Sequence, residues 1–289
     1  MIKRIVGFSG GIDSQATALW VRQRFPANEV LLLNSDPGGN EHPLTTEFLA
    51  WYSANGFPVT VVHPIIADLG NRGTRPGQCK DRRSEYADDA PMSFGDLAYI
   101  KGRFPASQLQ FCTEHLKLAP QRRWITENLV AHGIDYERYA GVRRDESRRR
   151  SDTPDRKWDD YFDCEVIYPG ASWTKQQCFA FVLEAGEQIN PLYTLGFSRV
   201  GCAPCVNSSK ADIREWAARF PEMISKVRKW EEQVGRTFFP PMLPNGEYAF
   251  IDDVVKWAKT VRGGKQIALP FAEAEAASGA CSSKYGLCD

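Results

Sequence analysis

Short apolar runs alternate with longer amphipathic stretches along most of the chain. The runs cover residues 5–8, 30–33, 59–62, 139–142 and 166–168. Each run has the length of one buried strand, and the stretches between them can hold helices. This alternation predicts an α/β fold with a mostly parallel sheet.

The amphipathic stretches carry helix start and stop signals. One helix is expected to begin at Pro43 and end at Gly56, and another to run from Pro120 to Gly133. Between about residues 68 and 111 the periodicity is lost among glycines and prolines. A segment of this length is either a functional lid or an insertion with short elements of its own.

Beyond Gly196 the pattern changes to helices alone, expected near residues 213–220, 223–234 and 254–257. Residues 272–280 are rich in Ala and Glu, and they precede a C-terminus that contains cysteines. We therefore expect a larger domain over residues 1–200 and a small helical, cysteine-rich region over residues 201–289.

Composition narrows the classes of partner. The 289 residues include 36 Lys+Arg and 36 Asp+Glu, a formal net charge of zero, so no global excess indicates nucleic-acid or membrane binding. No window approaches the ~18 apolar residues of a membrane span, and the N-terminus leads directly into the first strand. A cytoplasmic protein is expected, in which the eight cysteines are reduced thiols or metal ligands.

The segment after the first apolar run has the chemistry of a phosphate-binding loop. It reads Ser9-Gly10-Gly11-Ile12-Asp13-Ser14 and leads into a helical pattern. Glycines without Cβ atoms let backbone N–H groups approach an anion, and the positive end of a helix dipole adds attraction. Ser9 and Ser14 add hydroxyl donors, while Asp13 could hold a phosphate-bridging Mg²⁺ or fix the loop.

This loop resembles the S-G-G-x-D-S signature of the PP-loop ATP pyrophosphatase superfamily, which is adenine nucleotide alpha hydrolase-like. Members cleave ATP between the α- and β-phosphates or bind related sulfonucleotides. The resemblance implies a doubly wound α/β fold, with residues 1–200 as the nucleotide-binding domain.

Cysteines form the second candidate centre. Cys202-Ala-Pro-Cys205 is a C-x-x-C knuckle, and Cys281 and Cys288 form a second pair near the C-terminus. Paired thiolates suit Zn²⁺ or an iron–sulfur cluster, and the spacing alone does not separate the two. A redox-active dithiol is a further alternative. Cys79, Cys164 and Cys178 are scattered, and we interpret them as structural thiols.

Several other segments extend the resemblance to a specific family. They are residues 34–43, the segment around Cys112 and Lys117, Gly141-Val-Arg143-Arg-Asp-Glu146-Ser147, Trp173-Thr174, and residues 190–205. Together with the loop they resemble the phosphoadenosine/adenosine phosphosulfate reductase family, and the C-terminal C-S-S-x-Y-G-L-C pattern resembles its phage and prophage branch. Asp36 lies in the segment expected near the ribose and base.

The resemblance implies a [4Fe-4S] cluster, which we favour over zinc. The family's adjacent cysteine pair is incomplete here, because Thr113 follows Cys112. The ligands are then four of Cys112, Cys202, Cys205, Cys281 and Cys288. If Cys281 is a ligand, Cys288 is left as the nucleophile on a short tail. If Cys288 is the ligand instead, Cys281 is left free.

Basic residues would balance the anionic ligand. The resemblance places Lys117 and Arg143 near phosphate and sulfate oxygens, with Gly141, Glu146 and Ser147 in the same nucleotide site. The following arginines, residues 148–150, fit a solvated loop equally well. A nucleic-acid groove would need this run together with Arg72, Arg75, Arg82 and Arg83.

Two functions follow from these features. The first is reduction of an adenylyl sulfonucleotide to sulfite by a cysteine thiolate, with thioredoxin or glutathione as reductant. The second is ATP pyrophosphatase chemistry that adenylates a nucleic acid for sulfur transfer, as in DNA phosphorothioation or tRNA thiolation, with a cysteine desulfurase as the sulfur source. A third interpretation is an iron–sulfur module without catalysis. We favour the first, although the complete loop signature suits the second.

Overall fold

The computed structural model describes residues 2–70, 82–106, 109–239 and 249–260. A six-stranded sheet has the order β3-β2-β1-β4-β6-β5. All neighbouring strands are parallel except β5, which runs antiparallel to β6. The strands are β1 (Lys3–Gly7), β2 (Val30–Ser35), β3 (Val59–Val62), β4 (Tyr136–Tyr139), β5 (Arg156–Asp159) and β6 (Cys164–Ile167).

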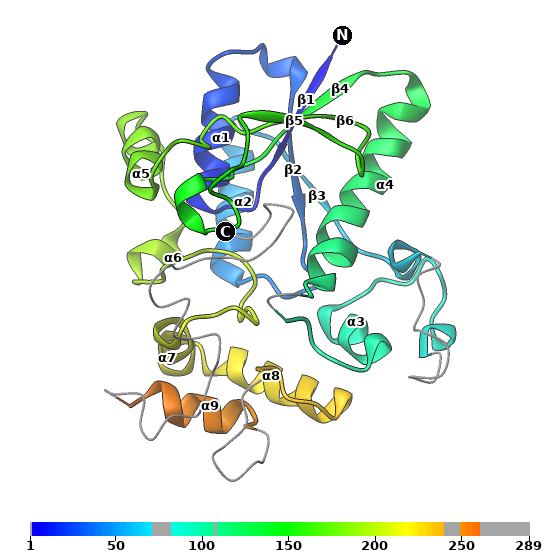
Figure 1. Ribbon diagram of the computed structural model, residues 1–289, viewed down its shortest axis with the longest axis vertical. Coiled ribbons are helices and arrows are strands. Elements are labelled where there is room, and N and C mark those ends of the chain that lie inside the picture. Colours follow the sequence, from blue (N-terminus) through cyan, green and yellow to red (C-terminus); the bar gives the residue numbers. More distant parts are fainter. Residues whose placement is uncertain (1, 71–81, 107–108, 240–248, 261–289) are drawn as a thin grey trace.

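Helices cover both faces of this sheet (Figure 1). Val6 and Leu32 pack with α1 and α2 on one face, whereas Ile5 and Leu33 pack with α4 on the other. Because successive residues of a strand face opposite sides, burial on both faces explains the continuous apolar runs. The predicted doubly wound α/β fold is confirmed. Its helices are α1 (Ile12–Arg22), α2 (Pro43–Ala54), α4 (Ala119–Asn128), α5 (Lys175–Glu184) and α6 (Pro191–Thr194).

One predicted strand is displaced, and one strand was not expected. The run at 139–142 lies mostly after β4, because the chain leaves the ladder once Tyr139 has paired with Ile167. Ala140 and Val142 are buried at the end of the sheet, so their apolar character reflects burial without strand pairing. β5 has no apolar run, since it is a largely exposed edge strand.

Residues 66–106 contain short elements, as the insertion interpretation expects. The α3 helix is fixed by a capping box in which the Asp96 N–H donates to Ser93 Oγ (3.0 Å) and the Ser93 N–H donates to the Asp96 carboxylate (3.0 Å). A π-helix precedes α4. The elements of this part of the chain are η2 (Ile66–Leu69), η3 (Arg82–Glu85), α3 (Phe94–Lys101) and the π-helix η4 (Thr113–Leu118). Elsewhere, short 3₁₀ helices are η1 (Ala27–Glu29), η5 (Val130–His132) and η6 (Arg144–Glu146).

The described residues beyond Ser209 are mostly helical, as predicted. The helices there are α7 (Lys210–Arg219), α8 (Pro221–Val234) and α9 (Ile251–Ala258). They share one hydrophobic cluster with α3, and Figure 1 shows these four helices together beyond the carboxyl ends of the strands. The division at residue 200 stays a prediction. Among the described helices, none is both long and apolar enough to cross a membrane.

Candidate functional site

A pocket of about 510 Å³ lies at the carboxyl ends of β1, β2 and β4. The strand order reverses at β1, because β2 lies on one side of it and β4 on the other. Open parallel sheets bind their ligands at such a switch point. The pocket is lined by Gly7, Phe8, Ser9, Ser14, Leu33, Asn34, Ser35, Glu41, Lys117, Gln121, Gly141 and Gly201.

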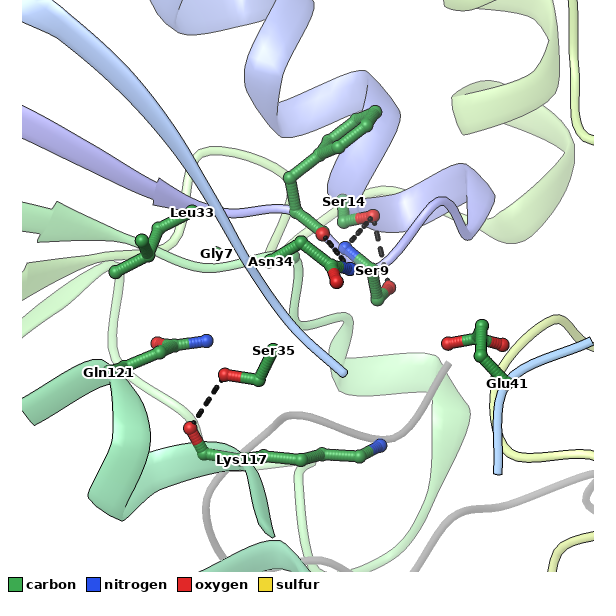
Figure 2. A pocket seen from close by; sticks show the side chains of 12 residues that line it. Gly7, Ser9, Ser14, Leu33, Asn34, Ser35, Glu41, Lys117 and Gln121 are labelled. Atoms are coloured by element: carbon green, nitrogen blue, oxygen red, sulfur yellow. Dashed lines mark hydrogen bonds between the residues drawn. The ribbon is translucent and has the colours of Figure 1, made fainter. Parts of the chain in front are cut away.

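The predicted phosphate loop forms one wall of this pocket. Gly10 has a φ of 80°, a conformation that favours glycine, and Gly11 caps the N-terminus of α1. Ser14 Oγ donates to the Gly11 carbonyl (2.8 Å) and accepts from the Ser9 N–H (3.2 Å). The two hydroxyls lie 3.1 Å apart at the pocket wall, as Figure 2 shows. Hydroxyl groups and a helix N-terminus together make this wall suitable for an oxyanion.

Asp13 and Arg143 form a buried ion pair behind the loop. Arg143 Nε donates to Asp13 Oδ1 at 2.6 Å, and Arg143 also pairs with Asp145. Neither Asp13 nor Arg143 is among the pocket-lining residues. The ion pair joins the loop to the segment after β4, and a role of Asp13 in holding a phosphate-bridging Mg²⁺ stays a prediction.

Gly141 lets the segment after β4 contact the first turn of α1. A Cβ atom here would lie 2.5 Å from the Asp13 carbonyl carbon and 2.6 Å from the Ser14 nitrogen, both backbone atoms. No side chain can be accommodated at that distance without moving the loop. Gly141 lines the pocket for this reason.

The other predicted nucleotide-binding residues are not among those that line the pocket. Asp36 accepts from the Gly39 N–H (2.8 Å) and lies 3.2 Å from the His63 ring, which shapes the turn after β2. Glu146 forms a buried ion pair with Arg150. The Ser147 hydroxyl is buried and has no hydrogen-bond partner within the described residues.

Lys117 and Glu41 form the opposite side of the pocket. The Lys117 carbonyl accepts from Ser35 Oγ (2.8 Å), and its side chain extends across the pocket toward Glu41 (Figure 2). Burial raises the pKa of Glu41 to about 7, although the Lys117 charge opposes the shift. Burial lowers the pKa of Lys117, but negative charge on Cys202, Cys112 and Glu41 outweighs it, so the pKa is raised overall. Lys117 therefore remains a cation.

Three of the five predicted ligand cysteines gather beside Lys117. Burial, together with charge on Cys202 and Cys205, raises the pKa of Cys112 to about 12. Burial also raises the pKa of Cys202, to about 11, with Lys117 acting against the shift. The thiols are thus within electrostatic range of one another. Within the described residues, however, no three His, Cys, Asp or Glu side chains form a metal site.

The remaining cysteines lie elsewhere. Cys281 and Cys288, like Cys79, lie outside the described residues. Cys164 and Cys178 are buried in two separate hydrophobic clusters, as expected for structural thiols.

Asn40 joins the segment after β2 to the cysteine knuckle. Its carbonyl accepts from the Ala203 N–H (2.9 Å), and its Nδ2 donates to the Pro204 carbonyl (3.2 Å). Asn40 is fully buried, and its Oδ1 has no partner in the described part of the chain. The position of the knuckle relative to Glu41 therefore depends on this residue.

Comparisons with known proteins agree with this arrangement. Residues 90–208 match the phosphoadenosine phosphosulfate reductase domain. An uncharacterised 37.8 kDa protein of Escherichia phage 186 is 30% identical over 99% of this chain and 96% of its own length. The chain belongs to the phosphoadenosine/adenosine phosphosulfate reductase family. The full-length phage relative also confirms the resemblance to the phage branch.

Family members with named activities match over shorter segments. An adenosine 5′-phosphosulfate reductase of Streptomyces coelicolor is 40% identical over 27% of this chain and 35% of its own length. One from Allochromatium vinosum is 32% identical over 32% of this chain and 30% of its own. The chain thus matches about a third of each reductase. A Candida auris phosphoadenylyl-sulfate reductase structure covers 70% of this chain and 82% of its own, at 16% identity and a TM-score of 0.46.

Sequence reasoning missed several pocket residues. Asn34, Ser35 and Glu41 lie inside the segment 34–43 that carries the family resemblance, so a signal was present. Gly201 lies inside the segment 190–205, which also carries the resemblance, so a signal was present there too. Gln121 carried none, because a glutamine in a helix is an ordinary feature.

Proposed function

We propose that the protein binds an adenylyl sulfonucleotide at the Ser9–Ser14 loop and reduces it to sulfite through a cysteine thiolate. One observation carries the proposal: a single pocket joins the phosphate loop to Lys117, which lies within electrostatic range of Cys112, Cys202 and Cys205. A phosphate site beside thiols suits a substrate that contains both phosphate and sulfate.

Different described residues would bind the phosphate and the sulfate of the substrate. Ser9, Ser14 and the N-terminus of α1 hold the phosphate, and Lys117 neutralises charge on the neighbouring sulfate. Because burial raises the pKa of Glu41 to about 7, this carboxyl group carries only part of its negative charge at neutral pH. The substrate anion is therefore bound by groups that are already in place.

The chemical step would use the thiolate of Cys288, which lies outside the described residues. The thiolate attacks the sulfate sulfur, an S–S bond forms, the S–O bond to phosphate breaks, and AMP leaves. A dithiol such as thioredoxin then attacks the cysteine sulfur. Sulfite departs, the cysteine is regenerated, and the dithiol is oxidised to a disulfide.

The cysteine group is suited to a [4Fe-4S] cluster. Cys112, Cys202 and Cys205 would supply three thiolates, and Cys281 or Cys288 the fourth; if Cys288 ligates, Cys281 takes the nucleophilic role. A bound cluster would supply a charged, redox-capable centre beside the substrate. Zinc would use the same thiolates. Because burial raises the pKa of Cys112 and Cys202, ligation must release protons and should strengthen with pH.

Turnover by the anaerobically purified full chain tests this proposal. With a dithiol, adenosine phosphosulfate should yield sulfite and AMP in equal amounts, and its 3′-phosphorylated form should yield sulfite and adenosine 3′,5′-bisphosphate in equal amounts. Iron and acid-labile sulfide should copurify in equal amounts, and zinc without sulfide would contradict the cluster. Failure to form sulfite from either substrate would reject the reductase proposal.

ATP pyrophosphatase chemistry is the second candidate, because the loop carries the complete S-G-G-x-D-S pattern. In that case ATP with Mg²⁺ yields pyrophosphate, and AMP is transferred to an acceptor such as a nucleic acid. Adding ATP in a parallel reaction separates the candidates. Pyrophosphate release without sulfite production would favour this second function.

A further inference from the structure

A second lysine, from the C-terminal helices, contacts the segment that leads to the pocket residue Glu41, although it does not itself line the pocket. Lys226 lies on α8, and its ammonium donates to the Gly39 carbonyl at 2.8 Å. Gly39 precedes Asn40, the residue that binds the knuckle, and Glu41, which lines the pocket. The Trp230 ring lies 5.2 Å from the same ammonium. These contacts connect α8 to the loop between the pocket and the cysteines.

The charges around Lys226 are largely those around Lys117. Burial lowers the pKa of Lys226, while Cys202, Asp36 and Glu41 favour its charged form. Cys202 and Glu41 also act on Lys117. Two cations from separate elements, η4 and α8, therefore act on the same thiol and the same carboxyl group.

Lys226 is not held by a carboxylate of its own. Among the residues that the structure describes, no Asp or Glu forms an ion pair with it, in contrast to Lys256 on α9, which pairs with Asp253 at 3.0 Å. Asp36 is engaged by Gly39 and His63. Because burial raises the pKa of Glu41 to about 7, that carboxyl neutralises only part of the local positive charge near neutral pH. This side of the pocket is suited to an anion.

We propose that Lys226 binds the terminal oxyanion of an adenylylated anion, opposite Lys117. Two ligands share this chemistry: the sulfate of adenosine phosphosulfate and the β-phosphate of ADP or ATP. The inference rests on the proposed nucleotide site and extends it to a helix outside the matched family domain, which ends at residue 208. In the absence of ligand, the Gly39 carbonyl holds the ammonium near the pocket.

Three nucleotides that differ only at the terminal group test the inference. Calorimetric titration of the full chain should use AMP, adenosine phosphosulfate and ADP, because AMP lacks the terminal oxyanion. In Lys226→Met we expect about 10- to 100-fold weaker binding of adenosine phosphosulfate, ADP or both, since a charged hydrogen bond is lost. AMP affinity should change less than about threefold, which also shows that the variant is folded.

Two matched variants sharpen the result. Lys226→Arg should retain most of the affinity, and Lys229→Met, which removes an exposed lysine one turn away on α8, should behave as wild type. Loss for ADP alone identifies the ligand as phosphate, and loss for adenosine phosphosulfate alone identifies sulfate; both support the inference. Equal affinity of wild type and Lys226→Met for both ligands overturns it. A wild-type protein that binds none of the three nucleotides overturns the proposed nucleotide site itself.

Discussion

Asp13 shows how a single residue of the phosphate loop contributes without contacting the pocket. Its carboxylate is 5% exposed and is held by Arg143, which lies 130 residues away in the sequence. The pair joins the loop after β1 to the segment after β4. Loop geometry therefore depends on a contact between two distant segments.

Replacing Asp13 should destabilise the protein. Removal of one partner from a buried ion pair leaves the other charge without full compensation. Because Arg143 still pairs with Asp145, we expect Asp13→Ala to lower the free energy of unfolding by only about 3 kcal/mol. Urea unfolding measures this loss. Glu127→Ala, which removes an exposed carboxylate from α4, should change it by less than about 0.5 kcal/mol. An equal effect of both variants would contradict the structural role of Asp13.

Gly141 gives a second prediction at this scale. In Gly141→Ala the new methyl group would collide with the backbone of Asp13 and Ser14, so the loop must shift. We expect a loss of about 1–3 kcal/mol in unfolding free energy and at least about tenfold weaker AMP binding. Gly170→Ala is the control, because its Cβ would meet only the Trp173 ring at 3.8 Å. Unchanged AMP affinity in Gly141→Ala would show that the loop tolerates the methyl group.

At the scale of elements, Glu231 connects α8 to α9. Its carboxylate accepts from the Phe238 N–H (2.8 Å) and from the Ile251 N–H (2.9 Å) at the start of α9. Glu231 is 2% exposed, and burial raises its pKa above the ordinary value of 4.5, although both N–H groups oppose the shift. One buried carboxylate thus orders the helix that carries Lys226 against its neighbour.

This raised pKa predicts a pH dependence of stability. The folded state retains a proton that the unfolded state releases above about pH 4.5, so the contribution of Glu231 is full below that pH and is lost as pH rises through the folded pKa. Glu231→Gln does not titrate. The stability difference between wild type and this variant, measured by urea unfolding across pH, should therefore decrease as pH rises above 4.5. Glu232→Gln on the exposed side of α8 is the control, and a flat difference for Glu231→Gln would refute the prediction.

At the scale of the whole molecule, the C-terminal helices and residues 66–116 share one hydrophobic cluster. Leu97 of α3 and Val227 of α8 are both fully buried in it. The pocket also joins segments on both sides of residue 200, since Glu41 follows β2 and Gly201 begins the knuckle. Shared burial predicts that the two parts unfold together.

Truncation tests this expectation. A chain that ends at residue 200 would expose the apolar surface of α3, so we expect it to bind a hydrophobic dye and to lose cooperative thermal unfolding. A chain that ends at residue 260 keeps every described helix and should unfold cooperatively. If the shorter chain also unfolds in one cooperative transition, residues 1–200 form an independent domain, as the sequence predicted.

The sequence alone determined the class of fold, the phosphate loop, the C-terminal helices and the family. These features depend on local patterns: apolar runs, glycines at a strand-to-helix turn and characteristic cysteine spacing. Only the tertiary structure showed that Asp13 pairs with Arg143 and that Asn40 holds the knuckle. It also placed Lys117 and Lys226 at one group of thiols. Such contacts arise when distant segments pack and lose solvent together, and burial, charge and pKa are properties of that packing which no local pattern contains.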